Sequence, residues 1–393
     1  MSFANLTSCL HHIVENYHVP GVDCIVYQDH MPVFRHIEGL SDLETGKPMA
    51  GNELYYIFSM TKMLTCAAAL QLWEQGKYHM DDPIAKYLPE FAKMRISEKG
   101  FDAGIGDQVA RGRSLGQESG IQADSYAKTQ ITVRHLFTMT AGLDYDLQAQ
   151  GITKAIAEGK TSTRDLVKAL SETVLGFEPG TRYRYSLCHD VLAGLIEIWS
   201  GQSFGAHLYE NITGPLGMKD TTFHKPTSSE RMAAMYIYDD PHTVRRLPLN
   251  CAFALTEQYE SGGAGLISSA EDYALFVDAL ACGGVGRNGT RVLAAETVEL
   301  MRTNQLSDIQ LEDFHLVRDG YGYGLGVRTH MCPGDSKSLS PVGEFGWDGA
   351  AGAFSLVDVE HKLSLTYFQH VHNWDRKYQE ELTNALYSDY FGK

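Results

Sequence analysis

Positive charge is scarce in this 393-residue sequence: 33 lysine and arginine residues stand against 49 aspartate and glutamate residues, which gives a net charge of −16. Nucleic acids and anionic membrane surfaces are bound through basic patches, so this balance argues against both as partners. Long apolar runs are missing as well, and no uncharged stretch reaches the length needed to cross a bilayer. We interpret the acidity as a matter of solubility.

Cysteine is also sparse and shows no pairing pattern. The seven cysteines form no Cys-x-x-Cys motif and stand at positions 9, 24, 66, 188, 251, 282 and 332. The first residues lack the basic segment, apolar core and cleavage site of a secretory signal. We therefore expect reduced, mostly buried thiols in a cytoplasmic protein.

The sequence offers little for a metal or a cofactor. His370 and His372 stand two residues apart, so on a strand they would share a face, and Asp375 follows them. No matching set of ligands comes after this pair, and we interpret it as a polar pair at the end of a strand. The sequence thus predicts no metal and no cofactor.

The most informative motif is Ser59-Met-Thr-Lys62, at the start of an apolar segment. Helical residues three apart lie on the same face, so Lys62 can reach the Ser59 hydroxyl and accept its proton. A serine is a weak nucleophile without such a neighbour. Met63, Cys66 and Leu70 continue at helical spacing, which predicts a buried helix and a partly desolvated lysine with a lowered pKa. The alternative interpretation is that Ser59 is an ordinary helix N-cap.

Two other serine motifs are set aside on their context. Ser125-Tyr-Ala-Lys128 repeats the spacing, but it ends a polar run over 99–130 that predicts a surface loop bordering the active site. Gly-Gln-Ser203-Phe-Gly matches the nucleophile elbow of α/β-hydrolases, which requires a strand before it. The residues before it have helical spacing instead, so Ser203 is expected to cap the next helix.

Strands are predicted at both ends of the chain and helices in the middle. The chain is predicted to begin with an amphipathic helix and to close with a helix over 376–387. Residues 160–305 are predicted to be mostly helical. The strands are expected over residues 22–27, 31–37, 322–329, 353–359 and 362–369.

This order of elements predicts an α/β (α+β) fold made of two lobes. Residues 1–75 and 310–393 would form an α/β lobe built from both termini. Residues 76–309 would form an inserted, mainly helical lobe, with the active site between the two.

A serine–lysine pair still needs a group that relays a proton to the departing part of the substrate. Tyr185 is the candidate, because a nearby lysine ammonium lowers the cost of a tyrosinate. Tyr183 would point the opposite way if the segment is extended. Taken alone, each of the two is an ordinary half-buried aromatic residue.

The third segment begins at Trp347 and is rich in glycine and alanine up to residue 352. Small residues let a substrate carbonyl approach the backbone closely. The backbone N–H groups of Ser59 and Ala350 could then form an oxyanion hole. The alternative is a plain glycine-rich turn between strands.

Together these motifs resemble class C β-lactamases and related penicillin-binding-protein-like serine hydrolases over nearly the whole chain. The motifs are Ser59-Met-Thr-Lys62, Tyr185-Ser-Leu187 and Trp347-Asp-Gly349, with similar supporting segments at 131–143, 214–218 and 261–268. The resemblance implies a β-lactamase/transpeptidase-like fold with an antiparallel sheet flanked by helices. It also implies acylation of Ser59, with Lys62 and Tyr185 sharing the proton transfer.

Two departures from the lactamase pattern bear on the substrate. A class C β-lactamase would carry Lys-Thr-Gly where this chain has Trp347-Asp348-Gly349, so the cation for the drug's carboxylate is missing and Asp348 would repel it. The asparagine expected after the tyrosine is Leu187, which removes an amide donor. The Trp-x-Gly pattern is similar to that of family VIII carboxylesterases and related acyltransferases. It implies that the pocket for a short-chain ester is bordered by Trp347, Asp348, Gly349 and Leu187.

The resemblance therefore implies hydrolysis of a small-molecule ester, without nucleic acid or membrane as a partner. Alternatives left open are a β-lactamase, a D-amino-acid amidase or peptidase, an acyltransferase, and a non-hydrolytic penicillin-binding sensor or scaffold.

Overall fold

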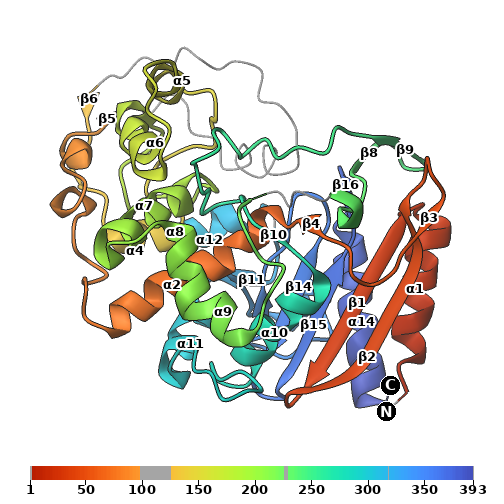
Figure 1. The fold of residues 1–393 in the computed structure, drawn as a ribbon. Helices are drawn as coiled ribbons and strands as arrows, with labels where there is room; N and C mark the ends of the chain where they lie inside the picture. The colour runs from red at the N-terminus through yellow and green to blue at the C-terminus, as the bar shows by residue number, and fades with distance from the viewer. Residues whose placement is uncertain (1, 98–124, 225–228, 317, 393) are drawn as a thin grey trace.

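The computed structural model of the chain describes residues 2–97, 125–224, 229–316 and 318–392. Figure 1 shows a central sheet with helices on both of its faces and a further group of helices beyond one side. Within the described ranges, no helix combines the length and the apolar character needed to cross a membrane.

An eight-stranded antiparallel sheet lies at the centre of the fold, and both ends of the chain contribute to it. The N-terminal part supplies β1 (Gly21–Gln28), β2 (Met31–Asp42) and β3 (Lys47–Pro48) at one edge. The C-terminal part supplies β15 (Leu363–Phe368) next to β1, followed by β14 (Phe354–Asp358), β13 (Phe345–Gly346), β12 (Arg328–His330) and β11 (Tyr321–Tyr323).

The two faces of β1 pack against different helices, because successive side chains of a strand point to opposite sides. Val22, Cys24 and Val26 belong to a core shared with α1 (Ala4–Asn16) and α14 (Lys377–Phe391), which lie together beside the two chain ends in Figure 1. Ile25 and Tyr27 belong to the larger core on the other face, where α10 (Ala270–Ala281) covers the sheet. Burial on both faces explains the nearly continuous apolar run of this strand.

The larger core surrounds α2 (Thr61–Glu74), whose residues from Thr61 to Leu70 are all buried. This helix packs against α7 (Cys188–Ser200) and α8 (Phe204–Leu208). The other α-helices of the described residues are α4 (Val133–Phe137), α5 (Gln150–Ala157), α6 (Thr163–Ala169), α9 (Gly214–Leu216), α11 (Ala295–Arg302), α12 (Asp308–His315) and α13 (Pro333–Ser336).

In the part of the chain that the structure describes, short strands make three small sheets around the main one. β4 (Tyr55–Tyr56) pairs with β10 (Ile267–Ser268) just before the nucleophile segment. The second contains β16 (Val371–His372), β8 (Tyr236–Asp240) and β9 (Thr243–Arg246), and the third contains β5 (Arg95–Ile96), β6 (Ser125–Tyr126) and β7 (Val174–Leu175).

The predicted fold class is confirmed, as are the first helix, the terminal helix and the strands over 22–27, 31–37, 353–359 and 362–369. The predicted strand over 322–329 is wrong. The chain reverses there between β11 and β12, and Gly326 has the positive φ of 83° that such a turn requires. The mostly helical prediction for 160–305 missed the hairpin of β8 and β9, which is held by pairing with the distant β16.

The division into lobes stays a prediction, as does the cytoplasmic location. The helix α10 belongs by sequence to the predicted inserted lobe, yet it packs on β15 and β1 of the main sheet. Most of the polar run over 99–130, predicted to be a loop bordering the active site, lies outside the described residues.

Candidate active site

Ser59 lies in the short 3-10 helix η1 (Phe58–Met60), which leads directly into α2. The residue is only 4% exposed. Phe58 has a φ of 45°, a left-handed conformation that residues other than glycine seldom adopt. Such strain persists where the surrounding packing fixes the backbone, and it is frequent beside reactive groups. Ser59 is not the N-cap of α2, since Met60 holds that position.

Lys62 lies in the first turn of α2 and is fully buried. Its Nζ atom is 3.3 Å from Ser59 Oγ, so the helical spacing does bring the two groups together. Nζ also donates to the Tyr145 hydroxyl at 2.9 Å and to the Gly263 carbonyl oxygen at 2.6 Å. The same atom lies 4.5 Å from the centre of the Tyr185 ring.

Burial lowers the pKa of Lys62 from 10.5 to about 7, against the opposing effect of the Asp190 carboxylate. A substantial fraction of the amine is therefore neutral near pH 7. A neutral amine has a lone pair that can accept the Ser59 proton while an N–H still donates to Gly263. The site thus combines a buried hydroxyl with a base whose pKa suits neutral conditions.

Tyr145 is a candidate site residue that the sequence reasoning missed. Its hydroxyl accepts from Lys62, and its ring stacks on Tyr185 with 5.5 Å between ring centres. Burial raises the pKa of Tyr145 well above its usual range, although a hydrogen bond with Ser59 acts in the opposite direction. The residue lies in a loop after α4, where no periodicity links it to α2. The only signal in the sequence is a tyrosine that follows closely after the supporting segment 131–143.

Asp190 and the segment 261–265 pack together and position the backbone carbonyl that accepts from Lys62. Asp190 Oδ1 accepts from the Tyr259 hydroxyl at 2.7 Å and from Ser261 Oγ at 2.6 Å. A Cβ atom on Gly263 would lie only 2.5 Å from Asp190 Oδ2, so the close approach requires glycine. This packing places the Gly263 carbonyl against the lysine amine.

Tyr185 and Trp347 form an aromatic wall next to Lys62. Trp347 Nε1 donates to the Tyr185 hydroxyl at 3.2 Å, and the two rings stack with 5.6 Å between their centres. Tyr183 makes its aromatic contacts elsewhere, with Phe314 and Tyr323. Of the two neighbouring tyrosines, it is therefore Tyr185 that faces the lysine.

The turn between β13 and β14 lies against the backbone just before Ser59. A Cβ atom on Gly349 would be 2.5 Å from the Ile57 carbonyl oxygen, so only glycine permits this contact. Trp374 Nε1 donates to the Ala350 carbonyl oxygen at 3.1 Å and fixes the orientation of that peptide. The two predicted oxyanion donors thus come from segments that are in direct contact.

Asp348 lies in the same turn, and its carboxylate is already engaged. It forms an ion pair with Arg318 and accepts from Gln379 Nε2 at 3.1 Å. Burial would raise the pKa of Asp348, but the Arg318 charge holds it below its usual range. Leu187, the other predicted substrate contact, is buried at the start of α7.

The sequence motifs that were set aside lie outside this cluster. Ser125 is exposed in β6, and Lys128 is exposed shortly after it. Ser203 accepts from the Ala206 N–H at 3.3 Å and caps α8, as predicted.

His370 and His372 are both buried around β16. His370 Nδ1 lies 3.0 Å from the Ala233 carbonyl oxygen, and the His372 ring packs edge-on against Phe58. Burial lowers the pKa of these imidazoles to about 3 and about 4, respectively. In the described ranges, neither belongs to a group of three side chains that could hold a metal ion.

Comparison with known proteins connects this geometry to a family. The family model described as Beta-lactamase matches residues 6–388. Protein Rv1367c of Mycobacterium tuberculosis is 32% identical over 339 residues, which cover 84% of this chain and 80% of the relative. Esterase EstB of Burkholderia gladioli is 28% identical over 371 residues, which cover 88% of this chain and 84% of the esterase.

Solved structures match the whole fold. EstCE1, described as a hydrolase with promiscuous acyltransferase activity, superposes with a TM-score of 0.77 at 22% identity, over 98% of this chain and 97% of its own. Further relatives are named "Acyltransferase mokF", from Monascus pilosus, and "Putative D-alanyl-D-alanine carboxypeptidase", from Escherichia coli. The chain belongs to the β-lactamase family and is a serine hydrolase of the class C and penicillin-binding-protein-like kind.

Proposed function

We propose that the protein hydrolyses short-chain carboxylic esters through an acyl-enzyme on Ser59. The observation that carries the proposal is the fully buried Lys62 amine, 3.3 Å from Ser59 Oγ, with its pKa lowered to about 7. A base with a pKa near the working pH is the most effective one for proton transfer. The esterase and hydrolase names among the relatives support the same reaction class.

The first half of the reaction forms the acyl-enzyme. Lys62 accepts the Ser59 proton while Oγ attacks the ester carbonyl, and the backbone N–H groups of Ser59 and Ala350 stabilise the oxyanion. As the carbonyl re-forms, the bond to the alcohol oxygen breaks. Tyr185 donates its proton to that oxygen and recovers one from the Lys62 ammonium, which lies over its ring.

The second half releases the acid. Water loses a proton to the Tyr185–Lys62 pair and attacks the acyl carbonyl, and Ser59 leaves with that proton. An alcohol in place of water would give acyl transfer by the same steps. The Trp347 N–H, which donates to the Tyr185 hydroxyl, would favour the transient tyrosinate.

The surroundings of the site favour a neutral ester over an anionic lactam. Aromatic rings of Tyr145, Tyr185 and Trp347 stack in sequence beside Lys62. The Arg318 guanidinium lies 5.5 Å from the centre of the Trp347 ring, but its charge is engaged by Asp348. An anionic substrate would have to compete with this carboxylate for the cation.

The proposal is tested by comparing substrates on one enzyme preparation. We expect p-nitrophenyl butyrate to be cleaved much faster than a chromogenic cephalosporin or an acyl-D-alanyl-D-alanine peptide. A series of p-nitrophenyl esters from acetate to decanoate should show the highest kcat/KM for short acyl chains.

Ser59→Ala serves as the control for background hydrolysis. Cephalosporin turnover that matches or exceeds ester turnover would contradict the esterase assignment and favour a β-lactamase. Covalent labelling of Ser59 without turnover of any substrate would favour a penicillin-binding sensor.

A further inference from the structure

A second cluster of reactive side chains lies on the sheet face opposite α10. In β2, alternate residues share a face, so His36 and Glu38 point to the same side. Their partners in the neighbouring strand β1 are Cys24 and Val22, which face α1. The two side chains therefore stand at the edge of the core beneath this helix.

His11 reaches the same place from α1. Leu6, Leu10 and Ile13 bury one side of this helix against the sheet and fix its orientation. His11 lies on the flank of the helix and stays half exposed. The packing of α1 against β2 thus brings the His11 side chain next to His36 and Glu38 of β2.

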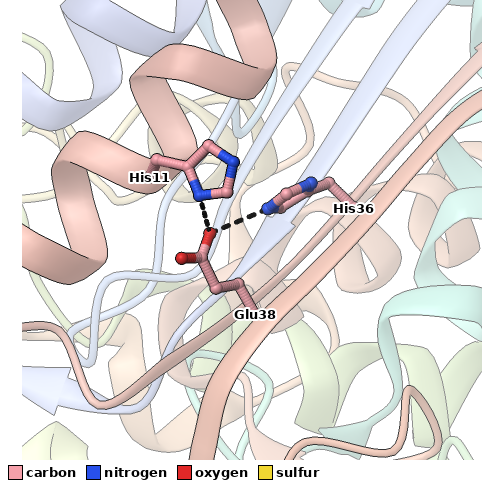
Figure 2. A group of neighbouring side chains, drawn as sticks. All are labelled: His11, His36 and Glu38. Carbon is pink, nitrogen blue, oxygen red and sulfur yellow. Dashed lines mark hydrogen bonds and ion pairs between the residues drawn. The ribbon is translucent and has the colours of Figure 1, made fainter.

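The ligating atoms of the three residues converge. Figure 2 shows both imidazole rings turned toward one carboxylate oxygen of Glu38. His11 Nδ1 is 2.8 Å and His36 Nε2 is 2.9 Å from Glu38 Oε2, and all three atoms lie within 4.8 Å of one another. The two rings meet edge to face with 5.1 Å between their centres.

We propose that His11, His36 and Glu38 bind one Zn²⁺ ion, with water completing the coordination. Two imidazole nitrogens and a carboxylate oxygen are ligands that zinc prefers, and sites with three protein ligands keep an open position. Bonds of about 2.1 Å at the tetrahedral angle place ligand atoms about 3.4 Å apart. Each histidine nitrogen needs to move away from Glu38 Oε2 by only roughly half an ångström to reach that separation.

The charge and exposure of the cluster suit this ion. Glu38 supplies a carboxylate oxygen and the two histidines supply ring nitrogens, a donor set that zinc accepts. The side chains are 50%, 18% and 22% exposed for His11, His36 and Glu38, which leaves a path for the ion from solvent. Mg²⁺ and Ca²⁺ prefer all-oxygen sites, so the two imidazoles disfavour them.

A bound ion would link α1 to β2 and would take no part in ester cleavage. The Ser59 segment belongs to the larger core on the other face of the sheet, whereas α1 belongs to the second core. We therefore expect Zn²⁺ to raise the thermal stability and to leave the ester hydrolysis rate unchanged. This inference does not depend on the proposed esterase function.

A second group, His30, Asp278 and Cys282, has ligating atoms equally close together, but it is a weaker candidate. Both carboxylate oxygens of Asp278 already accept from His30, one from its backbone N–H at 3.2 Å and one from Nδ1 at 2.9 Å. Burial raises the pKa of Cys282 to about 12, which disfavours the thiolate that zinc requires. This group is the natural competitor in a binding experiment.

The test is a calorimetric titration of chelator-stripped protein with ZnCl₂, together with melting curves at each zinc concentration. We expect saturable binding of one ion and a rise in Tm, with no response to MgCl₂. His36→Gln and Glu38→Gln should each lower the zinc affinity by more than about tenfold. Loss of a residue that only hydrogen-bonds to a metal ligand already costs about tenfold, and these two residues are the proposed ligands themselves. His12→Gln, an exposed histidine on the same helix, is the matched control and should bind as the wild type does.

Three results would overturn the proposal. They are no saturable binding, unchanged affinity in both His36→Gln and Glu38→Gln, and loss of binding in Cys282→Ser instead. A far-UV circular dichroism spectrum and a cooperative melting transition like those of the wild type show that each metal-free variant is folded, so lost zinc binding cannot be attributed to unfolding.

Discussion

The spacing Ser-x-x-Lys occurs twice in this chain, in opposite physical settings. Ser59 and Lys62 are 4% and 0% exposed, whereas Ser125 and Lys128 are both exposed. The first pair spans η1 and the first turn of α2, so one turn of helix brings Nζ to 3.3 Å from Oγ. The second pair begins in the two-residue strand β6 and ends beyond it, so no helical turn brings the two side chains together. The Ser-x-x-Lys motif therefore gives a proton-transfer pair only where its segment is both helical and buried.

Burial is the part of this difference that creates the chemistry. It lowers the pKa of Lys62 to about 7, which makes the lysine a usable base. The neighbours also differ: Lys62 contacts Tyr145 and Gly263 within the core, while the Lys128 backbone N–H donates to the half-buried Glu178 carboxylate.

The largest effect is expected from the two serines. Ser59→Ala removes the nucleophile, and kcat/KM for p-nitrophenyl butyrate should fall by about 10⁴-fold or more. Ser125→Ala removes an exposed hydroxyl and should leave the rate unchanged. Steady-state kinetics on both variants measure the difference, and the reverse pattern would overturn the assignment of the nucleophile.

The two lysines come next. Lys62→Met should lower kcat by about 10²- to 10⁴-fold, the usual contribution of a general base, and Lys128→Met should have no effect. Melting curves separate lost chemistry from lost folding. Burial lowers the pKa of Lys62 in the folded state to about 7, whereas the unfolded chain keeps the ordinary value of 10.5. The buried lysine therefore lowers the free energy of unfolding by its full amount below pH 7, and this loss disappears as the pH rises toward 10.5. Lys62→Met should therefore melt at a higher temperature than the wild type at pH 7, and wild-type turnover in this variant would make the pairing incidental.

The same contrast explains how far the sequence could predict the site. The Ser59–Lys62 contact follows from helical spacing alone, and the main strands follow from apolar runs between turns. Tyr145 comes from a loop, and Arg318 reaches Trp347 and Asp348 across the fold. Contacts of this kind depend on how distant segments pack, and no local pattern encodes them. The hairpin of β8 and β9 was missed for the same reason, because its partner β16 lies near the end of the chain.

The two tyrosines beside Lys62 should differ in their effect. Tyr185→Phe removes the proposed proton relay and should lower kcat by about 100-fold. Tyr145→Phe removes one hydrogen bond to Lys62, worth about 1 kcal/mol, and should lower kcat roughly fivefold. Tyr126→Phe is the control, since that ring is 63% exposed beside Ser125. A larger loss for Tyr145→Phe than for Tyr185→Phe would assign the relay to Tyr145 instead.

The pH dependence of kcat/KM should report the burial of Lys62 directly. The lysine acts as a base only when it is neutral, so the rate should rise with pH and level off above about 7. Below that value the rate should fall by about tenfold for each pH unit. A rate profile measured from pH 5 to pH 9 in buffers of constant ionic strength tests this point. A profile that keeps rising up to pH 9 without levelling off would mean that the amine is solvated and has an ordinary pKa.

The smallest effect concerns the ion pair beside Trp347. Asp348→Asn removes the carboxylate that engages Arg318 and leaves the Gln379 amide a partner of similar shape. The freed guanidinium lies next to the Trp347 ring and could then meet an anionic substrate. We expect the ratio of kcat/KM for a half-succinate ester to that for the neutral butyrate ester to rise roughly threefold to fivefold, as for an ion pair worth about 1 kcal/mol.

Arg318→Met with Asp348→Asn is the matched double variant, and it should lose this gain because the Arg318 charge beside Trp347 is removed. If the single and double variants show the same ratio, Arg318 does not face the substrate. The ion pair would then act only by holding the turn that carries Trp347 and Ala350. In that case Asp348→Asn should lower kcat/KM for both substrates by a similar factor. The reason is that Trp347 and the Ala350 N–H would both be displaced from the Ser59–Lys62 pair.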